Sequence, residues 1–97
     1  MLIRLVRLTL KPEAVTSFQQ EFSVMAPKIR QYPGCHQLHL WMDLELNHIL
    51  TTYSEWDSES SLNDYRESSL FKTNWALVKP MFAAPAMVHS YVRLPKE

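Results

Sequence analysis

The sequence predicts one α+β domain over residues 1–97, in which an antiparallel sheet of four strands carries its helices on one face. Apolar residues alternate in four short segments, which is the period of a strand. In the segments between them, apolar residues recur every three or four positions, which is the period of a helix. The resulting order is strand, helix, strand, strand, helical pair, strand. This order is the split βαβ, or ferredoxin-like, pattern.

The first predicted strand, residues 2–10, is largely apolar on both faces. Arg4 shares one face with Leu8, and Arg7 shares the other with Leu5. A strand of this kind is typical of a sheet that is covered on both sides. Since helices are expected on one face only, we expect a second subunit to cover the other face in a homodimer. Either arginine can meet an anionic substrate or pair with a carboxylate across that dimer.

The first predicted helix begins at Pro12 and carries an apolar stripe. Pro27 lies within this stripe, and a proline ring clashes with the carbonyl four residues before it. We therefore expect a kink, or a stop and restart, near Ala26. A turn ending at Gly34 follows the helix. The stripe comprises Val15, Phe18, Phe22, Met25 and Ile29.

Residues 35–43 and 48–56 predict a β-hairpin that turns near Asn47. The alternation leaves open which face of residues 35–43 meets the helices. Residues 87–94 predict the last strand, and a charged tail follows at residues 96–97.

Two helices are expected between the hairpin and the last strand. Ser58 and Ser68 each offer a side-chain oxygen that can cap a helix. The first helix is expected over residues 59–66. The second is expected to begin near Leu70 and to become distorted around Pro80.

Composition excludes several classes of function. Ten basic and ten acidic residues give a formal net charge of 0, which does not predict binding to nucleic acid or to an anionic membrane. No apolar run approaches the ~18 residues of a membrane helix, and no signal peptide is expected. The single cysteine, Cys35, excludes an intramolecular disulfide and favours a cytoplasmic location. The single glycine, Gly34, excludes glycine-rich phosphate loops, so neither a nucleotide nor a Rossmann-held flavin is expected as cofactor.

The four histidines do not predict a metal site. His36 and His39 are three residues apart on a predicted strand and so point to opposite faces. Neither a His-x-His nor a His-x-x-x-His spacing occurs. Cys35 has no evident base partner, and we expect a buried, inert thiol.

Four aromatic side chains are expected to converge where the third strand ends and the helical pair begins. Leu62 is expected on the same helical face as Tyr65, which is one of the four. Such a cluster favours an apolar pocket for a small aromatic molecule. The same rings can instead be ordinary core packing, because aromatic residues dominate protein cores. The four are Trp56, Tyr65, Phe71 and Trp75.

Three short motifs, in this order and spacing, resemble the antibiotic biosynthesis monooxygenase family. They are Pro-Gly-Cys-His at residues 33–36, Ser-Glu-Trp-Asp-Ser at residues 54–58, and Ser-x-x-Phe at residues 68–71. The resemblance covers nearly the whole chain. It implies a dimeric α/β barrel in which two sheets face each other and each subunit has a pocket between its sheet and its helices. It further implies oxidation of quinols or polycyclic aromatic molecules by oxygen without metal or flavin, although one branch degrades haem and other members have no established activity.

The resemblance carries over to single residues only in part. Trp56 matches the family's tryptophan at the end of the third strand. Polyketide-oxidising members have Asn and Tyr where this chain has Thr52 and Leu62. Quinol-oxidising members have His where this chain has Tyr65 and Leu70.

The leading hypothesis is therefore a cofactor-independent monooxygenase that oxidises a quinol or a polycyclic phenol. Such chemistry needs a substrate that donates an electron to oxygen, a flat apolar slot, and a group that takes or shares a proton. Tyr65 is the catalytic candidate that would orient the substrate oxygen, and His39 is the candidate base. His39 at a dimer interface and Tyr65 as a packing residue are the alternatives. The substrate-binding candidates are Trp56, Leu62, Phe71 and Trp75.

Two other hypotheses remain. A non-catalytic dimeric module that binds a hydrophobic ligand or a partner protein is favoured by the missing Asn and His residues. Haem handling is the weaker hypothesis. The haem branch has an asparagine on its first strand and an axial histidine on its last helix, and this chain has Val6 and Trp75 at those positions. Neither side chain can bind iron.

Overall fold

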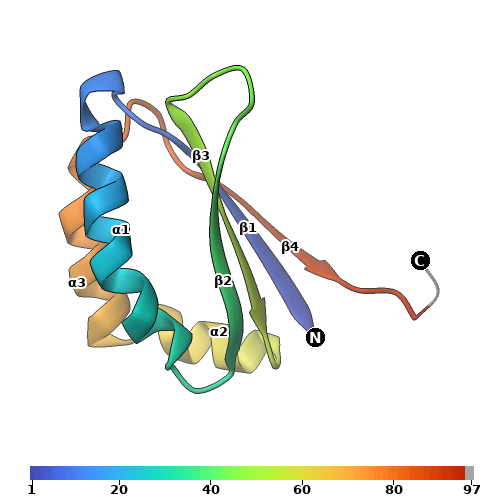
Figure 1. Cartoon of the computed structure of the whole chain (residues 1–97). Coiled ribbons are helices and arrows are strands. Elements are labelled where there is room, and N and C mark those ends of the chain that lie inside the picture. Colours follow the sequence, from blue (N-terminus) through green and yellow to red (C-terminus); the bar gives the residue numbers. More distant parts are fainter. Residues whose placement is uncertain (96–97) are drawn as a thin grey trace.

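The computed structural model describes residues 1–95 and has the expected arrangement, a four-stranded antiparallel sheet with its helices on one face (Figure 1). The predicted order of elements and the ferredoxin-like α+β fold are confirmed. The predicted tail at residues 96–97 lies outside the described residues. The elements are β1 (Leu2–Thr9), η1 (Pro12–Ala14), α1 (Val15–Arg30), β2 (Cys35–Met42), β3 (Ile49–Trp56), α2 (Glu59–Arg66), α3 (Ser69–Val78), η2 (Lys79–Met81) and β4 (Met87–Val92), where η1 and η2 are single 3-10 turns.

The strands are ordered β2-β3-β1-β4, and every neighbouring pair is antiparallel. Because side chains alternate along a strand, the register sorts each strand into a row that faces the helices and a row on the open face. Residues that are paired across β3, β1 and β4 therefore share a face. Two helix-facing rows are Ser54–Arg4–Ser90 and Thr52–Val6–Val88, and all of their residues except Ser90 line the site described below.

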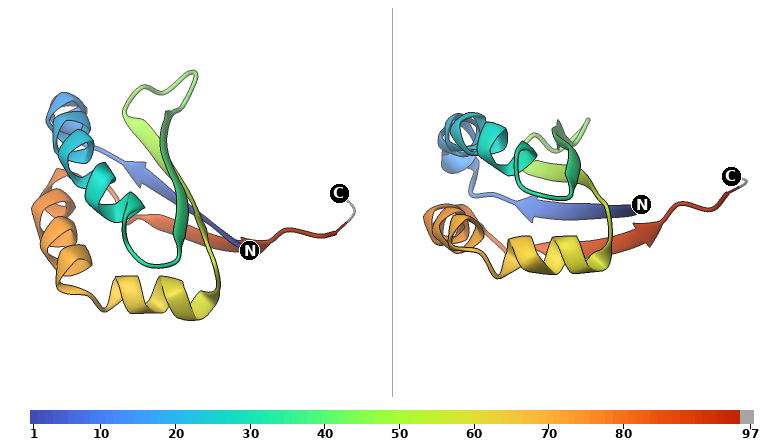
Figure 2. Two further views of the ribbon diagram at one scale, coloured as in Figure 1. Left: turned by 60° about the horizontal axis from the view of Figure 1, so that its bottom comes forward. Right: turned by 90° about the horizontal axis from the view of Figure 1, so that it is seen from below.

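The hydrophobic core lies between the sheet and the helices. α1 and α3 lie side by side across from the sheet, and α2 lies at the end where β3 terminates (Figures 1 and 2). Burial of apolar surface between these layers is the main source of stability. Within residues 1–95, none of the helices is long and apolar enough to cross a membrane. The large buried side chains are Leu8, Leu10, Phe18, Met25, Ile29, Leu38, Leu50, Trp56, Leu62, Tyr65 and Val78.

Serine side chains begin both helices of the predicted helical pair. The Ser58 hydroxyl oxygen accepts a hydrogen bond from the backbone N–H of Ser61 at 3.2 Å, at the start of α2. The Ser68 hydroxyl oxygen accepts one from the backbone N–H of Phe71 at 3.1 Å, at the start of α3. Each cap satisfies a backbone donor that the helix itself leaves free. The two caps therefore fix the residues at which α2 and α3 begin.

The prolines at residues 27 and 80 affect their helices differently. α1 continues unbroken through Pro27, so the stop and restart expected near Ala26 is wrong. Buried side chains on both sides of the proline keep the helix on the sheet although one N–H donor is missing. α3 ends at Val78, and the distortion expected around Pro80 is the tighter turn η2.

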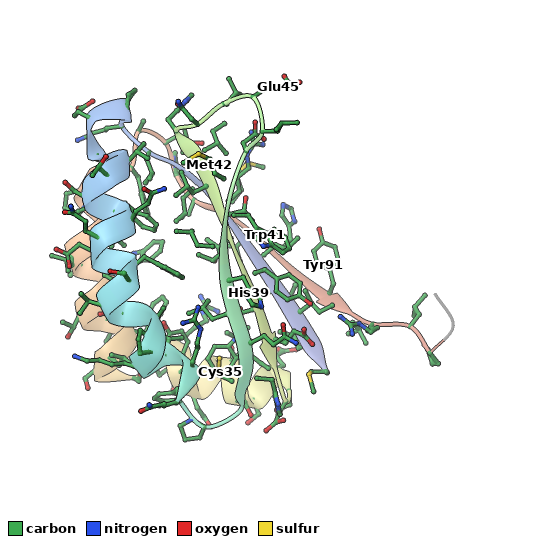
Figure 3. The ribbon with its side chains drawn as sticks, in the orientation of Figure 1. Cys35, His39, Trp41, Met42, Glu45 and Tyr91 are labelled. Atoms are coloured by element: carbon green, nitrogen blue, oxygen red, sulfur yellow. The ribbon has the colours of Figure 1, made fainter. Side chains whose placement is uncertain are left out.

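No helix covers the other face of the sheet within the part of the chain that the structure describes (Figure 2). His39, Trp41 and Tyr91 project from this open face, away from the helices (Figure 3). Trp41 stacks on Tyr53 with ring centroids 5.1 Å apart, yet half of the Trp41 side chain remains exposed.

Gly34 occupies a turn where a side chain cannot be accommodated. Its φ is +90°, and a Cβ atom built on it would lie 2.5 Å from the Cβ of Ser61 on α2. We predict that Gly34→Ala lowers the free energy of unfolding by about 2 kcal/mol or more, because the positive φ and the clash both penalise the folded state. Urea denaturation followed by circular dichroism measures this change.

A double variant separates the two causes. Ser61→Gly removes the obstructing side chain but leaves the backbone angle unchanged. Gly34→Ala combined with Ser61→Gly should therefore regain part, and not all, of the lost stability. A Gly34→Ala protein within about 0.5 kcal/mol of wild type would show that this turn does not pack on α2 as described.

Candidate functional site

A cavity of about 540 Å³ lies between the helix-facing side of the sheet and the helices α1, α2 and α3. Its floor is made of side chains from all four strands, and small or narrow ones lie beside Arg4. Its walls are aromatic and aliphatic side chains from the helices. Protein interiors are normally close-packed, so a space of this size is a feature that demands an explanation. The floor residues include Val6, Thr52, Ser54 and Val88, and the aromatic wall residues are Phe18, Phe22, Trp56, Tyr65, Phe71, Trp75 and Phe82.

The four predicted rings do converge, and they form a continuous series along one wall. Trp56 stacks on Tyr65 with centroids 4.9 Å apart and an interplanar angle of 24°. Tyr65 meets the edge of Phe71 at 5.3 Å, and Phe71 stacks on Trp75 at 5.8 Å with an angle of 11°. Leu62 lines the same cavity from α2. The rings pack against one another and also line the cavity.

Trp56 is held more firmly than the other rings. Its side chain is 1% exposed, and its indole N–H donates a hydrogen bond to the Ser54 hydroxyl oxygen at 3.0 Å. This bond satisfies the one polar group of a buried indole. Since the Ser54 oxygen is the acceptor there, its own O–H remains available to donate into the cavity that Ser54 lines.

The Tyr65 hydroxyl is a donor and not a base. Burial raises the pKa of Tyr65 well above its usual range, and the neighbouring Cys35 adds to that effect. The phenol therefore stays protonated at neutral pH. Within residues 1–95 its hydroxyl has no hydrogen-bond partner, although its ring is packed between Trp56 and Phe71. A donor of this kind can orient a substrate oxygen.

The structure does not bring His39 together with the other predicted site residues. Its ring lies on the open face, where Nε2 is 3.0 Å from the Gln37 Oε1 atom (Figure 3). Leu38 and Leu40 face the helices instead, which settles the orientation that periodicity left open for β2. The alternation of side chains along the strand separates His39 from the cavity.

Several polar residues of the cavity, Lys79 of η2 among them, were not identified as site residues from the sequence. Arg66 and Asn74 line the cavity from α2 and α3, and Ser54 lines it from β3. Helical spacing offered a signal for Arg66 and Asn74. Arg66 follows Leu62 by four positions and Asn74 follows Phe71 by three, so each shares a face with a predicted wall residue.

Arg4 lies in the floor of the cavity, whereas Arg7 is exposed. Burial lowers the pKa of the Arg4 guanidinium, and the positive charge of Arg66 lowers it further. The Arg4 Nη1 atom donates a hydrogen bond to the Ser90 hydroxyl oxygen at 3.0 Å. Of the two arginines on β1, only Arg4 can therefore touch a molecule in the cavity.

The described residues hold no group of three or more metal-ligating side chains. The two positions that correspond to the haem branch's ligands, Val6 and Trp75, both line the cavity and offer iron no donor atom. Cys35 is partly buried, and burial raises the pKa of its thiol, in keeping with the inert thiol expected from the sequence.

Together these features define a class of protein, a ferredoxin-like α+β domain with an aromatic-walled cavity between its sheet and its helices. The family model described as antibiotic biosynthesis monooxygenase matches residues 1–74. The chain belongs to this family, as the three sequence motifs implied.

Solved structures share the whole architecture. A crystal structure of an antibiotic biosynthesis monooxygenase matches with a TM-score of 0.90 at 21% identity, covering 98% of this chain and 100% of that one. A conserved protein from Methanosarcina mazei Go1 matches with a TM-score of 0.87 at 27% identity, covering 94% and 91%. A protein from Mycobacterium tuberculosis matches with a TM-score of 0.88 at 19% identity, covering 98% and 96%. At these identities the likeness establishes a common fold. A comparison with curated proteins found no match.

The buried phenol of Tyr65 predicts a loss of stability at high pH. The unfolded chain ionises this tyrosine near pH ~10, whereas the folded chain holds the proton to higher pH. The buried phenol therefore makes its full contribution to the free energy of unfolding below pH ~10. This contribution is lost as the pH rises above that value, by up to about 1.4 kcal/mol per pH unit. Tyr65→Phe should remove this part of the decline. Urea denaturation between pH 8 and 11 measures it.

Tyr91→Phe provides the control, because it deletes the same hydroxyl from a half-exposed ring on the open face. The free energy of unfolding of this variant should fall between pH 8 and pH 11 by as much as that of the wild type. An equal decline in wild type and Tyr65→Phe would contradict the burial of this phenol.

Proposed function

We propose that this protein is a cofactor-independent monooxygenase that oxidises a quinol or a polycyclic phenol with molecular oxygen. One observation carries the proposal: a cavity of about 540 Å³, walled by a series of aromatic rings, in a chain of the antibiotic biosynthesis monooxygenase family. A cavity of this size matches the space that small-molecule sites commonly offer. Flat rings stack on flat rings, so the walls favour a fused aromatic substrate.

The roles follow from position in the cavity. Trp75 and Phe71, which are half-buried and parallel, form the surface on which the substrate ring lies. Leu62 and Trp56 close the end near α2. Tyr65 donates its hydroxyl hydrogen to the substrate oxygen and so stabilises the phenolate. His39 has no part in this cavity, and we assign it to the subunit interface.

The oxidation needs no electron carrier besides the substrate. A phenolate transfers an electron to oxygen, and the resulting radicals combine at the ring carbon opposite the phenolic oxygen. The hydroperoxide that forms loses the hydrogen of that carbon and breaks its O–O bond. One oxygen atom remains as the second carbonyl of a quinone, and the other leaves as water. This route applies to a phenol whose opposite ring carbon bears hydrogen. A quinol, whose opposite carbon already bears oxygen, gives up two electrons and two protons to become the quinone, and oxygen leaves as hydrogen peroxide. The protein contributes orientation, stabilisation of the phenolate and exclusion of water.

A non-catalytic binding module is the second candidate, because one observation favours it. The lining of the cavity includes no histidine and no carboxylate, so no residue there can act as a general base at neutral pH. The proton of the phenol must then leave to solvent. A substrate that ionises readily can react in such a site, whereas one that does not can only bind.

Oxygen consumption tests the two candidates. Anthrone, the keto form of a polycyclic phenol, and 1,4-naphthalenediol should consume oxygen faster with protein than in buffer. With ¹⁸O₂, anthraquinone formed from anthrone should contain one labelled oxygen atom. Trp75→Ala should lower kcat/KM by about tenfold through lost stacking, and Tyr65→Phe should lower kcat by about five- to tenfold through one lost hydrogen bond.

Leu77→Ala is the matched control for Trp75→Ala. Leu77 lies two residues further along α3, its side chain is 47% exposed, and it does not line the cavity. It should keep the wild-type rate. Oxygen uptake no faster than in buffer would contradict the monooxygenase. If these compounds also raise the melting temperature, the result would support the binding module.

We also propose that the protein is a homodimer in which the open face of one sheet packs on that of a second copy. Leu5 lies in the middle of that face, on β1. Leu5→Lys should place a charge in the interface and change the species in sedimentation velocity from about twice 11.4 kDa to a single chain. Val24→Lys, on the 62% exposed outer side of α1, should leave the dimer intact. A wild-type protein that sediments as one chain would overturn the proposal.

A further inference from the structure

The floor of the cavity contains a cation in the middle of the sheet. Arg4 lies on β1, the central strand, between Ser54 of β3 and Ser90 of β4. Its only hydrogen bond to a side chain within residues 1–95 goes to the neutral Ser90 hydroxyl at 3.0 Å. A guanidinium in this position is partly removed from water, and a buried charge is stable only when it is paired.

Two further cations, Arg66 of α2 and Lys79 of η2, line the same cavity. Arg66, the last residue of α2, lines the cavity and is close enough to Arg4 to repel its charge. Neither arginine forms an ion pair with a carboxylate in the part of the chain that the structure describes. The cavity lining includes no aspartate or glutamate, although the chain has as many acidic as basic residues. The positive charge at this end of the cavity is therefore uncompensated.

The uncharged polar groups of the lining point to the same conclusion. The Asn74 Nδ2 atom is buried and has no hydrogen-bond partner among residues 1–95. The Ser54 oxygen already accepts a hydrogen bond from the Trp56 indole, which leaves its O–H to donate. Tyr65 also has a free hydroxyl. The cavity thus offers several hydrogen-bond donors that lack acceptors, and each buried one costs stability until an acceptor arrives.

We infer that the cavity takes a flat aromatic molecule that carries a carboxylate, with the carboxylate at the Arg4–Arg66 end and the rings against Phe71 and Trp75. A carboxylate supplies the acceptor oxygens and the negative charge that this end lacks, and arginine binds it through two parallel hydrogen bonds. The inference deepens the proposed function, because it names the charge of the substrate that the same site oxidises. A neutral polycyclic phenol of the same shape would leave both guanidinium groups unpaired.

A pair of inert probes tests the charge without any oxidation. 2-Naphthoate and 2-naphthamide have the same ring and nearly the same shape, but only the first is an anion at neutral pH. Titration calorimetry should show 2-naphthoate binding at least about tenfold more tightly. Arg4→Gln and Arg66→Gln should each reduce this preference, and the double variant should abolish it while it still binds 2-naphthamide.

Arg7→Gln is the matched control, because Arg7 lies on the same strand three residues away and does not line the cavity. It should keep the full preference. Arg66→Gln changes an exposed side chain, so its result stands even where Arg4→Gln lowers stability. Equal affinity for the two probes, binding of neither, or a preference that survives in the double variant overturns the inference. Oxygen consumption is measured separately. A protein that prefers 2-naphthoate but oxidises none of the compounds would support the anion site and contradict the proposed reaction.

Discussion

The burial of the Trp56 indole at the end of β3 is the interaction on which the rest of the structure depends. Its side chain is 1% exposed and is among the largest fully buried groups of the described chain. It stacks on Tyr65 of α2 and donates to Ser54 of its own strand, so it joins the sheet to the helices with both its apolar and its polar parts. Truncation of a buried aromatic side chain typically costs about 3–5 kcal/mol, which is a large share of the stability of a domain this small.

The cavity is a consequence of the same arrangement. Stacked rings extend from Trp56 along α2 and α3 to Trp75 and hold the helices away from the sheet. The floor beneath them has small side chains such as Thr52 and Ser54, which cannot fill the distance. Empty space in a core lowers stability. This space and the donors that line it are the basis on which we propose a ligand site.

Much of the fold was predictable from the residues alone. Two periods of apolar residues gave the order of elements, and serines at residues 58 and 68 gave the starts of α2 and α3. The convergence of Trp56, Tyr65, Phe71 and Trp75 was also predictable, because helical spacing and the end of a strand place them at one corner. The stop and restart expected at Pro27 was wrong, because the local cost of the proline was outweighed by the burial of side chains on both sides of it. Arg66 and Asn74 escaped notice as site residues because polar side chains on a helix usually face solvent.

The sequence by itself determined the class of fold, the family and the aromatic corner, because these depend on short-range periodicity and on local motifs. It could not assign the faces of the sheet, since alternation is symmetric until something covers one side. Only the tertiary structure decided that Arg4 enters the cavity while Arg7 remains outside, and that Leu38 faces inward while His39 faces outward. The physical reason is that the helices, folding back over one side of the sheet, select which of two equivalent rows becomes the floor of the site.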